Sequence, residues 1–288
     1  MSRSLQCSSR RGAGSTLGLT VVVLSLVLVL PACDLIRFGG SNLSKQQKDH
    51  IRQKVTAATC SDANRLAEAE KLFDSKGLQP ELEEYSEAVN VVSKLKGKTS
   101  ETIVVGAHYD KTTLGCGAID NWTGVVMLTM LAEELKASST QKTYLFVAFG
   151  GEERDLKGSR AMAYGMVKRE EDRPCAMVNL DSFGFEKAWA LKSISDDSLL
   201  KLASDVERKR GGSFSIRNYR GASSDSKSFQ LIGVPSITFS GLGDDWRDYL
   251  HQDSDIPENV DFESVFDNYE FLREFLRNLD ESSCESLK

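Results

Sequence analysis

The chain has 288 residues, a formal net charge of −6 and 40% hydrophobic residues. A chain of this length can bury the core of one sizeable domain. The negative charge and the lack of a long basic run exclude proteins that bind nucleic acid through a positively charged surface.

Residues 1–32 are typical of the signal peptide of a bacterial lipoprotein. Three arginines precede an uncharged apolar stretch over 17–30, which suits a signal peptide better than a full membrane span. The stretch ends in Leu30-Pro31-Ala32-Cys33, which resembles a lipobox, so Cys33 is expected to carry a lipid. An ordinary secretory signal is the alternative. In both cases we expect an exported protein of the cell envelope or periplasm. In the lipoprotein case we expect the lipid to be its only membrane contact.

Four cysteines remain after the predicted signal peptide and Cys33: Cys60, Cys116, Cys175 and Cys284. In an oxidising compartment they allow three disulfide pairings, and the sequence does not rank these pairings. Their spacing matches no zinc-finger pattern.

Residues 33–44 are predicted to be a polar tether, and residues 45–288 a single catalytic domain. Helical periodicity alternates with short β-branched apolar runs along the first part of this domain. The predicted elements are helices over 45–58 and 61–76, a strand over 88–92, a buried strand over 103–105, an apolar helix over 125–135, a buried strand over 144–149, a helix from about 158, and a strand over 176–180.

The alternation continues through the second part of the chain. The predicted elements are a strand near Trp189, a helix over 196–210, a strand over 214–216, a short helix over 227–231, a strand over 235–239 and a final helix over 263–279. Alternation of this kind predicts an α/β fold, a three-layer α/β/α sandwich on a mixed, mostly parallel sheet.

Ionisable side chains follow three of the predicted strands. His108 and Asp110 follow the first, Glu152 and Glu153 the second, and Asp181 the third. Because the carboxyl ends of the strands in an open α/β sheet line the ligand crevice, we expect these side chains to meet there.

Two loop residues, Asp120 and His251, are candidates to join them. Imidazole and carboxylate are the ligands of hydrolytic zinc sites, which use three protein ligands for each ion. Two such ions about 3.5–4 Å apart need a shared carboxylate. Five ligands with one shared residue satisfy this requirement.

These residues also carry a resemblance to metallopeptidase family 28. The motifs are His108-x-Asp110, Gly117-Ala118-x-Asp120-Asn121, Glu152-Glu153 followed by Gly158-Ser159, Asn179-x-Asp181, and His251 with Asp255. The resemblance runs from about Asn90 into the final helix. It implies a zinc-aminopeptidase-like fold and a co-catalytic dizinc exopeptidase, most similar to aminopeptidases, that acts on a peptide substrate.

The resemblance also implies a role for each residue. Asp120 would bridge two Zn²⁺ ions, or another divalent metal. His108 and Asp181 would complete the site of one ion, and Glu153 and His251 the site of the other.

Glu152 would be the general base that takes a proton from the bridging water and passes it to the leaving amine. Asp110 is expected to orient the imidazole of His108. The family also implies a cis peptide bond between Asp120 and Asn121.

Two other functions stay open at this point. A glutaminyl cyclase shares the fold and motif order but uses one zinc ion, and it tends to have Trp where this chain has Leu250. A non-catalytic envelope lipoprotein on the same fold would have lost a ligand or the base, and none is lost here. Gly151, Ser226 and Gln252 also depart from the family pattern, so the substrate specificity is not predicted. The sequence does not predict the oligomeric state either.

Overall fold

The computed structural model describes residues 42–169, 173–219 and 221–288. The predicted signal peptide, the lipidation site Cys33 and most of the tether lie outside these described residues. The described residues belong to one compact unit. None of the helices in the described part of the chain combines the length and the apolar character needed to cross a membrane.

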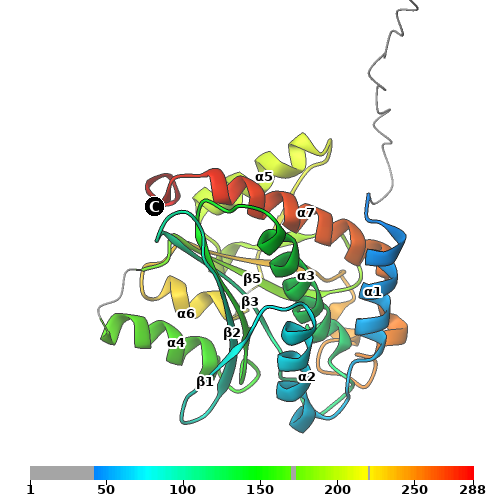
Figure 1. The fold of residues 1–288 in the computed structure, drawn as a ribbon. Helices are drawn as coiled ribbons and strands as arrows, with labels where there is room; N and C mark the ends of the chain where they lie inside the picture. Colours follow the sequence, from blue (N-terminus) through cyan, green and yellow to red (C-terminus); the bar gives the residue numbers. More distant parts are fainter. Residues whose placement is uncertain (1–41, 170–172, 220) are drawn as a thin grey trace, which may run out of the picture. The chain divides into compact units, whose positions relative to one another are not determined.

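An eight-stranded sheet organises this unit, in the order β1-β2-β4-β3-β5-β8-β6-β7. Figure 1 shows the sheet between layers of helices. The strands are β1 (Glu81–Glu84), β2 (Val89–Leu95), β3 (Thr102–His108), β4 (Thr143–Phe149), β5 (Ala176–Phe183), β6 (Trp189–Leu191), β7 (Ser215–Arg217) and β8 (Ser236–Gly241). The adjacent strands β4, β3, β5 and β8 are mutually parallel, whereas β2 and β6 pair antiparallel to β4 and β8. The carboxyl ends of four central strands therefore lie at one edge.

Helices cover both faces of the sheet, which confirms the predicted three-layer α/β/α sandwich. The helices are α1 (Lys45–Thr56), α2 (Asp62–Ser75), α3 (Thr123–Ala137), α4 (Lys157–Lys168), α5 (Asp197–Lys209), α6 (Ser226–Gln230) and α7 (Phe262–Glu281). Buried side chains of α1, α2, α3, α5 and α7 share one apolar core, and those of α4 and α6 contribute to the other. Along β3, Ile103 and Val105 belong to the first core and Val104 to the second, as the alternation of side chains in a strand requires.

Three features of the fold differ from the sequence prediction or add to it. Strand β1 was not predicted, because its sequence Glu-Leu-Glu-Glu has no apolar alternation; antiparallel pairing with β2 holds it in the sheet. Asp181 lies inside β5 instead of following it. A π-helical turn, η1 (Ala118–Trp122), precedes α3, and within it the peptide bond between Asp120 and Asn121 is cis, as the resemblance implies.

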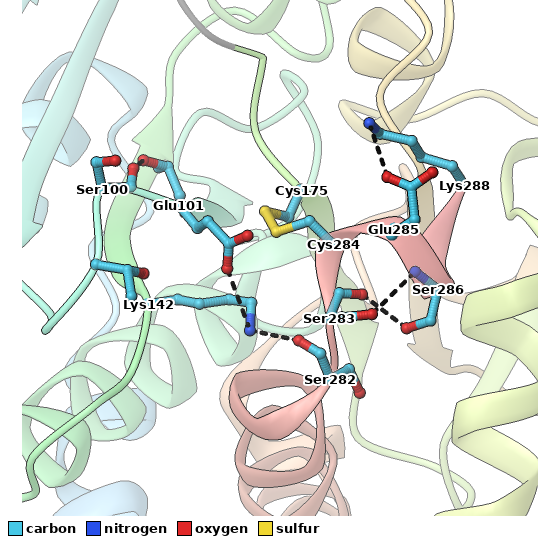
Figure 2. Close-up of a disulfide and its surroundings, with 12 residues drawn as sticks. Ser100, Glu101, Lys142, Cys175, Ser282, Ser283, Cys284, Glu285, Ser286 and Lys288 are labelled. Carbon is cyan, nitrogen blue, oxygen red and sulfur yellow. Dashed lines mark hydrogen bonds and ion pairs between the residues drawn. A yellow bond between two sulfur atoms is a disulfide. The ribbon is translucent and has the colours of Figure 1, made fainter.

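The structure settles the disulfide pairing, which joins Cys60 to Cys116 and Cys175 to Cys284. The first bond connects the segment before α2 to the loop before η1. The second connects the start of β5 to the 3-10 turn η5 (Cys284–Leu287) at the C-terminus (Figure 2).

The C-terminal end of α7 is also held by a buried lysine. Lys142 Nζ donates hydrogen bonds to the carbonyl oxygens of Asp280, at 2.8 Å, and Ser282. The carboxylate of Asp280 in turn accepts two backbone N–H groups just before β4. Lys142 and the Cys175–Cys284 disulfide together form what we call the C-terminal clasp (Figure 2).

Candidate metal centre

The imidazole of His108, at the end of β3, lies between two carboxylates. Its Nε2 is 3.1 Å from Asp120 Oδ1 and 3.6 Å from Asp181 Oδ1. Its Nδ1 is 3.2 Å from the carbonyl oxygen of Asp110. When Nδ1–H donates to this carbonyl, Nε2 is the nitrogen left to bind a metal.

A second histidine uses the other oxygen of Asp120. His251 comes from the loop between β8 and α7, and its Nε2 is 3.2 Å from Asp120 Oδ2 and 3.2 Å from Glu153 Oε2. The two carboxylate oxygens of Asp120 therefore face different histidines. The structure brings all five predicted ligands together at the carboxyl edge of the parallel strands.

The residue types and their arrangement fit zinc. Each histidine faces two carboxylate oxygens, which gives two groups of one nitrogen and two oxygen ligands that share Asp120. The ligand atoms of His108, Asp120 and Glu153 all lie within 4.8 Å of one another. Glu153 Oε1 is buried and has no hydrogen-bond partner among the described residues, and a bound cation would satisfy it.

The loop between β4 and α4 carries Glu152 and Glu153, and Asp110 holds it in place. The Asp110 carboxylate accepts hydrogen bonds from the backbone N–H groups of Glu152, at 3.1 Å, and Glu153, at 3.3 Å. The same carboxylate is 3.7 Å from His108 Nδ1. The sequence predicted only the role toward His108. Gly151 has φ +73°, a conformation that favours glycine and explains its presence before the two glutamates.

Two serines that the sequence did not single out contact the ligand carboxylates. Ser182 Oγ lies 3.1 Å from Asp120 Oδ1 and 2.9 Å from Asp181 Oδ1. Ser224 Oγ donates to Asp181 Oδ2 and accepts from Asn179 Nδ2 at 2.6 Å. The motif Asn179-x-Asp181 was visible in the sequence, but its partner lies 45 residues further along the chain.

Asp255 fixes the turn that presents Asp120. Its two carboxylate oxygens accept the backbone N–H groups of Ile119, at 2.7 Å, and Asp120, at 3.2 Å. Asn121 attaches the same turn to β5 by donating to the carbonyl of Leu180 at 2.7 Å. The turn around the cis peptide bond is thus held from the His251 loop and from the sheet.

The centre concentrates negative charge around its histidines. Hydrogen bonds to Asp120 and Glu153 raise the pKa of His251 to about 10. Burial opposes protonation of His108, but the surrounding carboxylates outweigh it and raise the pKa of this imidazole well above its usual range. Burial, reinforced by Asp181, also raises the pKa of the Glu152 carboxyl well above its ordinary value.

Zinc binding is therefore expected to weaken as the pH falls from 8 to 6. Both histidines have raised pKa values, so in the metal-free protein they carry protons that zinc must displace. Apparent affinity should fall by about tenfold per pH unit for each displaced proton. Calorimetric titration with zinc in buffers of different ionisation enthalpy measures the protons released. Zinc affinity that does not change with pH would contradict this electrostatic description.

A cavity of about 210 Å³ opens beside the metal-binding residues. Its lining also includes large apolar and aromatic side chains, those of Trp189, Leu191, Tyr219, Leu242, Trp246 and Leu250. The rings of Trp189 and Tyr219, and those of Tyr219 and Trp246, meet edge to face with centroids 5.6 and 6.0 Å apart. The cavity is therefore lined both by the candidate metal ligands and by packed aromatic rings.

A protein-family model matches most of this chain. The model of peptidase family M28 matches residues 90–276. The chain belongs to peptidase family M28. This confirms the family expected from the motifs, and the matched segment contains every residue of the centre described above.

Relatives of this M28 chain include aminopeptidases. Aminopeptidase YwaD of Bacillus subtilis is 31% identical over 147 residues, which cover 49% of this chain and 32% of YwaD. Leucine aminopeptidase 1 of Arthroderma gypseum is 26% identical over 269 residues, which cover 84% of this chain and 69% of the relative. The chain thus spans about a third of YwaD.

Solved structures share the M28 fold. LapB of Legionella pneumophila has a TM-score of 0.69 at 21% identity, over 82% of this chain and 71% of LapB. A glutaminyl cyclase of an Acidobacteriales bacterium has a TM-score of 0.72 at 18% identity, over 85% of this chain and 97% of the cyclase. At these low sequence identities, the similarity shows that the fold is shared and nothing beyond the fold.

Proposed function

We propose that the protein is a dizinc aminopeptidase that removes N-terminal residues from peptides. The observation that carries this proposal is the placement of Asp120, whose two carboxylate oxygens face His108 and His251 separately. A carboxylate shared in this way is what a pair of ions requires. Asp181 and Glu153 would complete the two ligand sets.

In this proposal Glu152 is the general base. Bound zinc would lower the pKa of the attacking water and polarise the scissile carbonyl. Glu152 lines the cavity beside the ligands, and a carboxylate in that place can accept a proton and return it. It would take the proton from the attacking water and deliver it to the leaving amine nitrogen, while Asp110 holds its backbone in place.

The aromatic lining of the cavity favours an apolar N-terminal residue. Trp246, Leu250 and His251 all line the cavity, and the ring of Tyr219 packs edge to face with that of Trp246. We expect Trp246→Ala to lower kcat/KM for leucine substrates by about tenfold or more, since apolar packing against a substrate side chain is worth about 1–3 kcal/mol. The decrease for alanine substrates should be smaller. Equal decreases for leucine and alanine substrates would show that Trp246 does not contact the side chain.

A substrate screen of the purified mature protein tests the main proposal. We expect release of the amine from aminoacyl anilides, loss of this activity with a chelator and its return with added zinc. Peptides with N-terminal glutamine belong in the same screen, because a cyclase would convert them to pyroglutamate without releasing an amino acid. Cyclisation without hydrolysis would reject the aminopeptidase.

Glutaminyl cyclase is the second candidate, favoured by the fold likeness to the cyclase of the Acidobacteriales bacterium. Two features weigh against it. Leu250 precedes His251 where the cyclases tend to have Trp, and the contacts of His108 and His251 with different carboxylate oxygens favour two ions over one. A metal content of one zinc per chain, together with cyclisation, would favour this candidate.

We also propose that the protein is exported and attached to a bacterial membrane by a lipid on Cys33. The apolar segment over 17–30 and the lipobox-like end support this proposal. The two disulfide bonds agree with an oxidising compartment. Cys33→Ser should abolish incorporation of labelled fatty acid into the protein. Fatty acid incorporated equally into this variant, or none incorporated into the unmodified protein, would reject lipidation at Cys33.

A further inference from the structure

We propose that Arg65, together with the Cys60–Cys116 disulfide, positions the metal centre. Arg65 lies on α2, outside the segment matched by the family model, and its side chain is fully buried. This inference rests on the metal centre proposed above. It states that the N-terminal helices α1 and α2 help to fix the positions of the metal ligands.

The guanidinium of Arg65 reaches the loop formed by residues 111–117, which leads into η1. It donates hydrogen bonds to the carbonyl oxygens of Cys116 and Gly117, the latter at 3.1 Å. Its Nε donates to the carbonyl of Thr59 at 2.8 Å, and its guanidinium carbon lies 4.7 Å from the centroid of the Trp122 ring. Arg65 therefore contacts both ends of the segment that contains Asp120.

Other bonds attach the 111–117 loop to the N-terminal helices. Cys60, just before α2, is bonded to Cys116, and the backbone N–H of Lys111 donates to Asp62 Oδ1 at 3.2 Å. The indole N–H of Trp122 donates to the carbonyl of Lys54 at 3.0 Å. The loop and the turn after it are thus anchored to α1 and α2.

The same loop packs closely against the His251 loop. The backbone N–H of Cys116 donates to the carbonyl of Asp255 at 2.7 Å. Gly115 has φ +62°, and a Cβ there would lie 2.4 Å from the carbonyl oxygen of Gln252, the residue after His251. Two backbones approach this closely only because residue 115 is glycine.

The contacts form a continuous path from Arg65 to two metal ligands. Arg65 holds the carbonyls of the 111–117 loop, the loop holds the backbone of Asp255, and the Asp255 carboxylate holds the backbone N–H of Asp120. His251 lies on the segment that packs against Gly115. A shift of the 111–117 loop would therefore move Asp120 and His251 together.

The positive charge of Arg65 also supports its role in positioning the metal centre. The negative charges of Asp255, Asp62, Asp110 and Asp120 favour the cationic form of the guanidinium. Burial lowers the pKa of Arg65 to about 10, so the side chain still carries a positive charge at neutral pH. Without this charge, the acidic residues around the metal centre would lose a source of favourable electrostatic interaction.

The test is zinc affinity of the full mature protein, measured without substrate by competition with a chromophoric chelator. We expect Arg65→Met to weaken zinc binding by about 10- to 100-fold, the effect usual for residues that hold metal ligands in place. The matched control is Lys142→Met, which removes another buried cation that donates to carbonyls but belongs to the C-terminal clasp. Both variants should lower the Tm, and only Arg65→Met should weaken zinc binding.

The two disulfides provide a second matched pair that does not depend on Arg65→Met folding. The double variant Cys60→Ser/Cys116→Ser should weaken zinc binding, whereas Cys175→Ser/Cys284→Ser should only lower the Tm. Unchanged zinc affinity in Arg65→Met or in the first double variant, or an equal loss in the control variants, would overturn the inference. If the unmodified protein binds no zinc, the proposed function fails instead, so the two failures are distinguishable.

Discussion

Glu152→Ala is expected to lower kcat by about 10²- to 10⁴-fold, the usual contribution of a general base, and to leave zinc bound. The ligands His108, Asp120 and Asp181 are held by hydrogen bonds to one another and to Ser182, which this substitution does not touch. Burial disfavours the ionised form of the Glu152 carboxyl in the folded metal-free protein, which is why its pKa is raised. Removal of this carboxyl should therefore not lower the Tm of the metal-free protein.

Zinc content, kcat and Tm are measured on the same preparation for this variant. Glu258→Ala is a suitable control, because Glu258 lies exposed in the 3-10 turn η4 (Pro257–Asn259) away from the ligands. Unchanged turnover in Glu152→Ala would reject Glu152 as the base. Loss of zinc in this variant would instead assign Glu152 a direct role in metal binding.

Asp120→Asn is expected to reduce both zinc content and activity. Each oxygen of the Asp120 carboxylate faces a different histidine, and the amide that replaces it offers only one oxygen. We expect at most one zinc ion per chain and a fall in kcat/KM of more than about 100-fold, since a ligand should matter more than the groups that support it. Metal analysis and steady-state kinetics check both effects.

The control for this substitution is Asp261→Asn. Asp261 caps α7 by accepting the backbone N–H of Glu263 at 3.0 Å, and its side chain contacts no residue of the centre in the described structure. The control should keep its zinc and its activity. An Asp120→Asn protein that retained two zinc ions and full turnover would contradict the shared-ligand assignment.

The sequence predicted the strands of the site and the side chains that follow them, because each strand can be recognised from a short stretch of residues. Runs such as Ile103-Val104-Val105 are too short and too β-branched for a helix, so a buried strand was the natural interpretation. The parallel arrangement then determines where the side chains after each strand must meet. His108 and the Glu152–Glu153 pair were found in this way.

Contacts between distant segments were not predicted. Arg65 and Gly117 are 52 residues apart, and Ile119 and Asp255 are 136 residues apart. No local periodicity links such pairs. The disulfide pairing was open for the same reason, since spacing alone does not say which segments are neighbours.

The hydrogen bonds that the Asp110 carboxylate accepts from the Glu152–Glu153 backbone are another contact between distant segments that the sequence did not predict. The position of Asp110 two residues after His108 indicated a contact with that imidazole, which lies 3.7 Å away in the structure. The shorter contacts of its carboxylate are with backbone N–H groups 42 and 43 residues further along the chain. Side-chain to backbone bonds of this kind have no residue-type signature at the partner position.

A crystal structure of the zinc-loaded protein, with anomalous diffraction recorded on both sides of the zinc absorption edge, is the most direct test of the shared metal centre. We predict two anomalous peaks about 3.5–4 Å apart. Asp120 should bridge them, with His108 and Asp181 at one peak and Glu153 and His251 at the other. A single peak, or two peaks with no contact to Asp120, would contradict the dizinc centre.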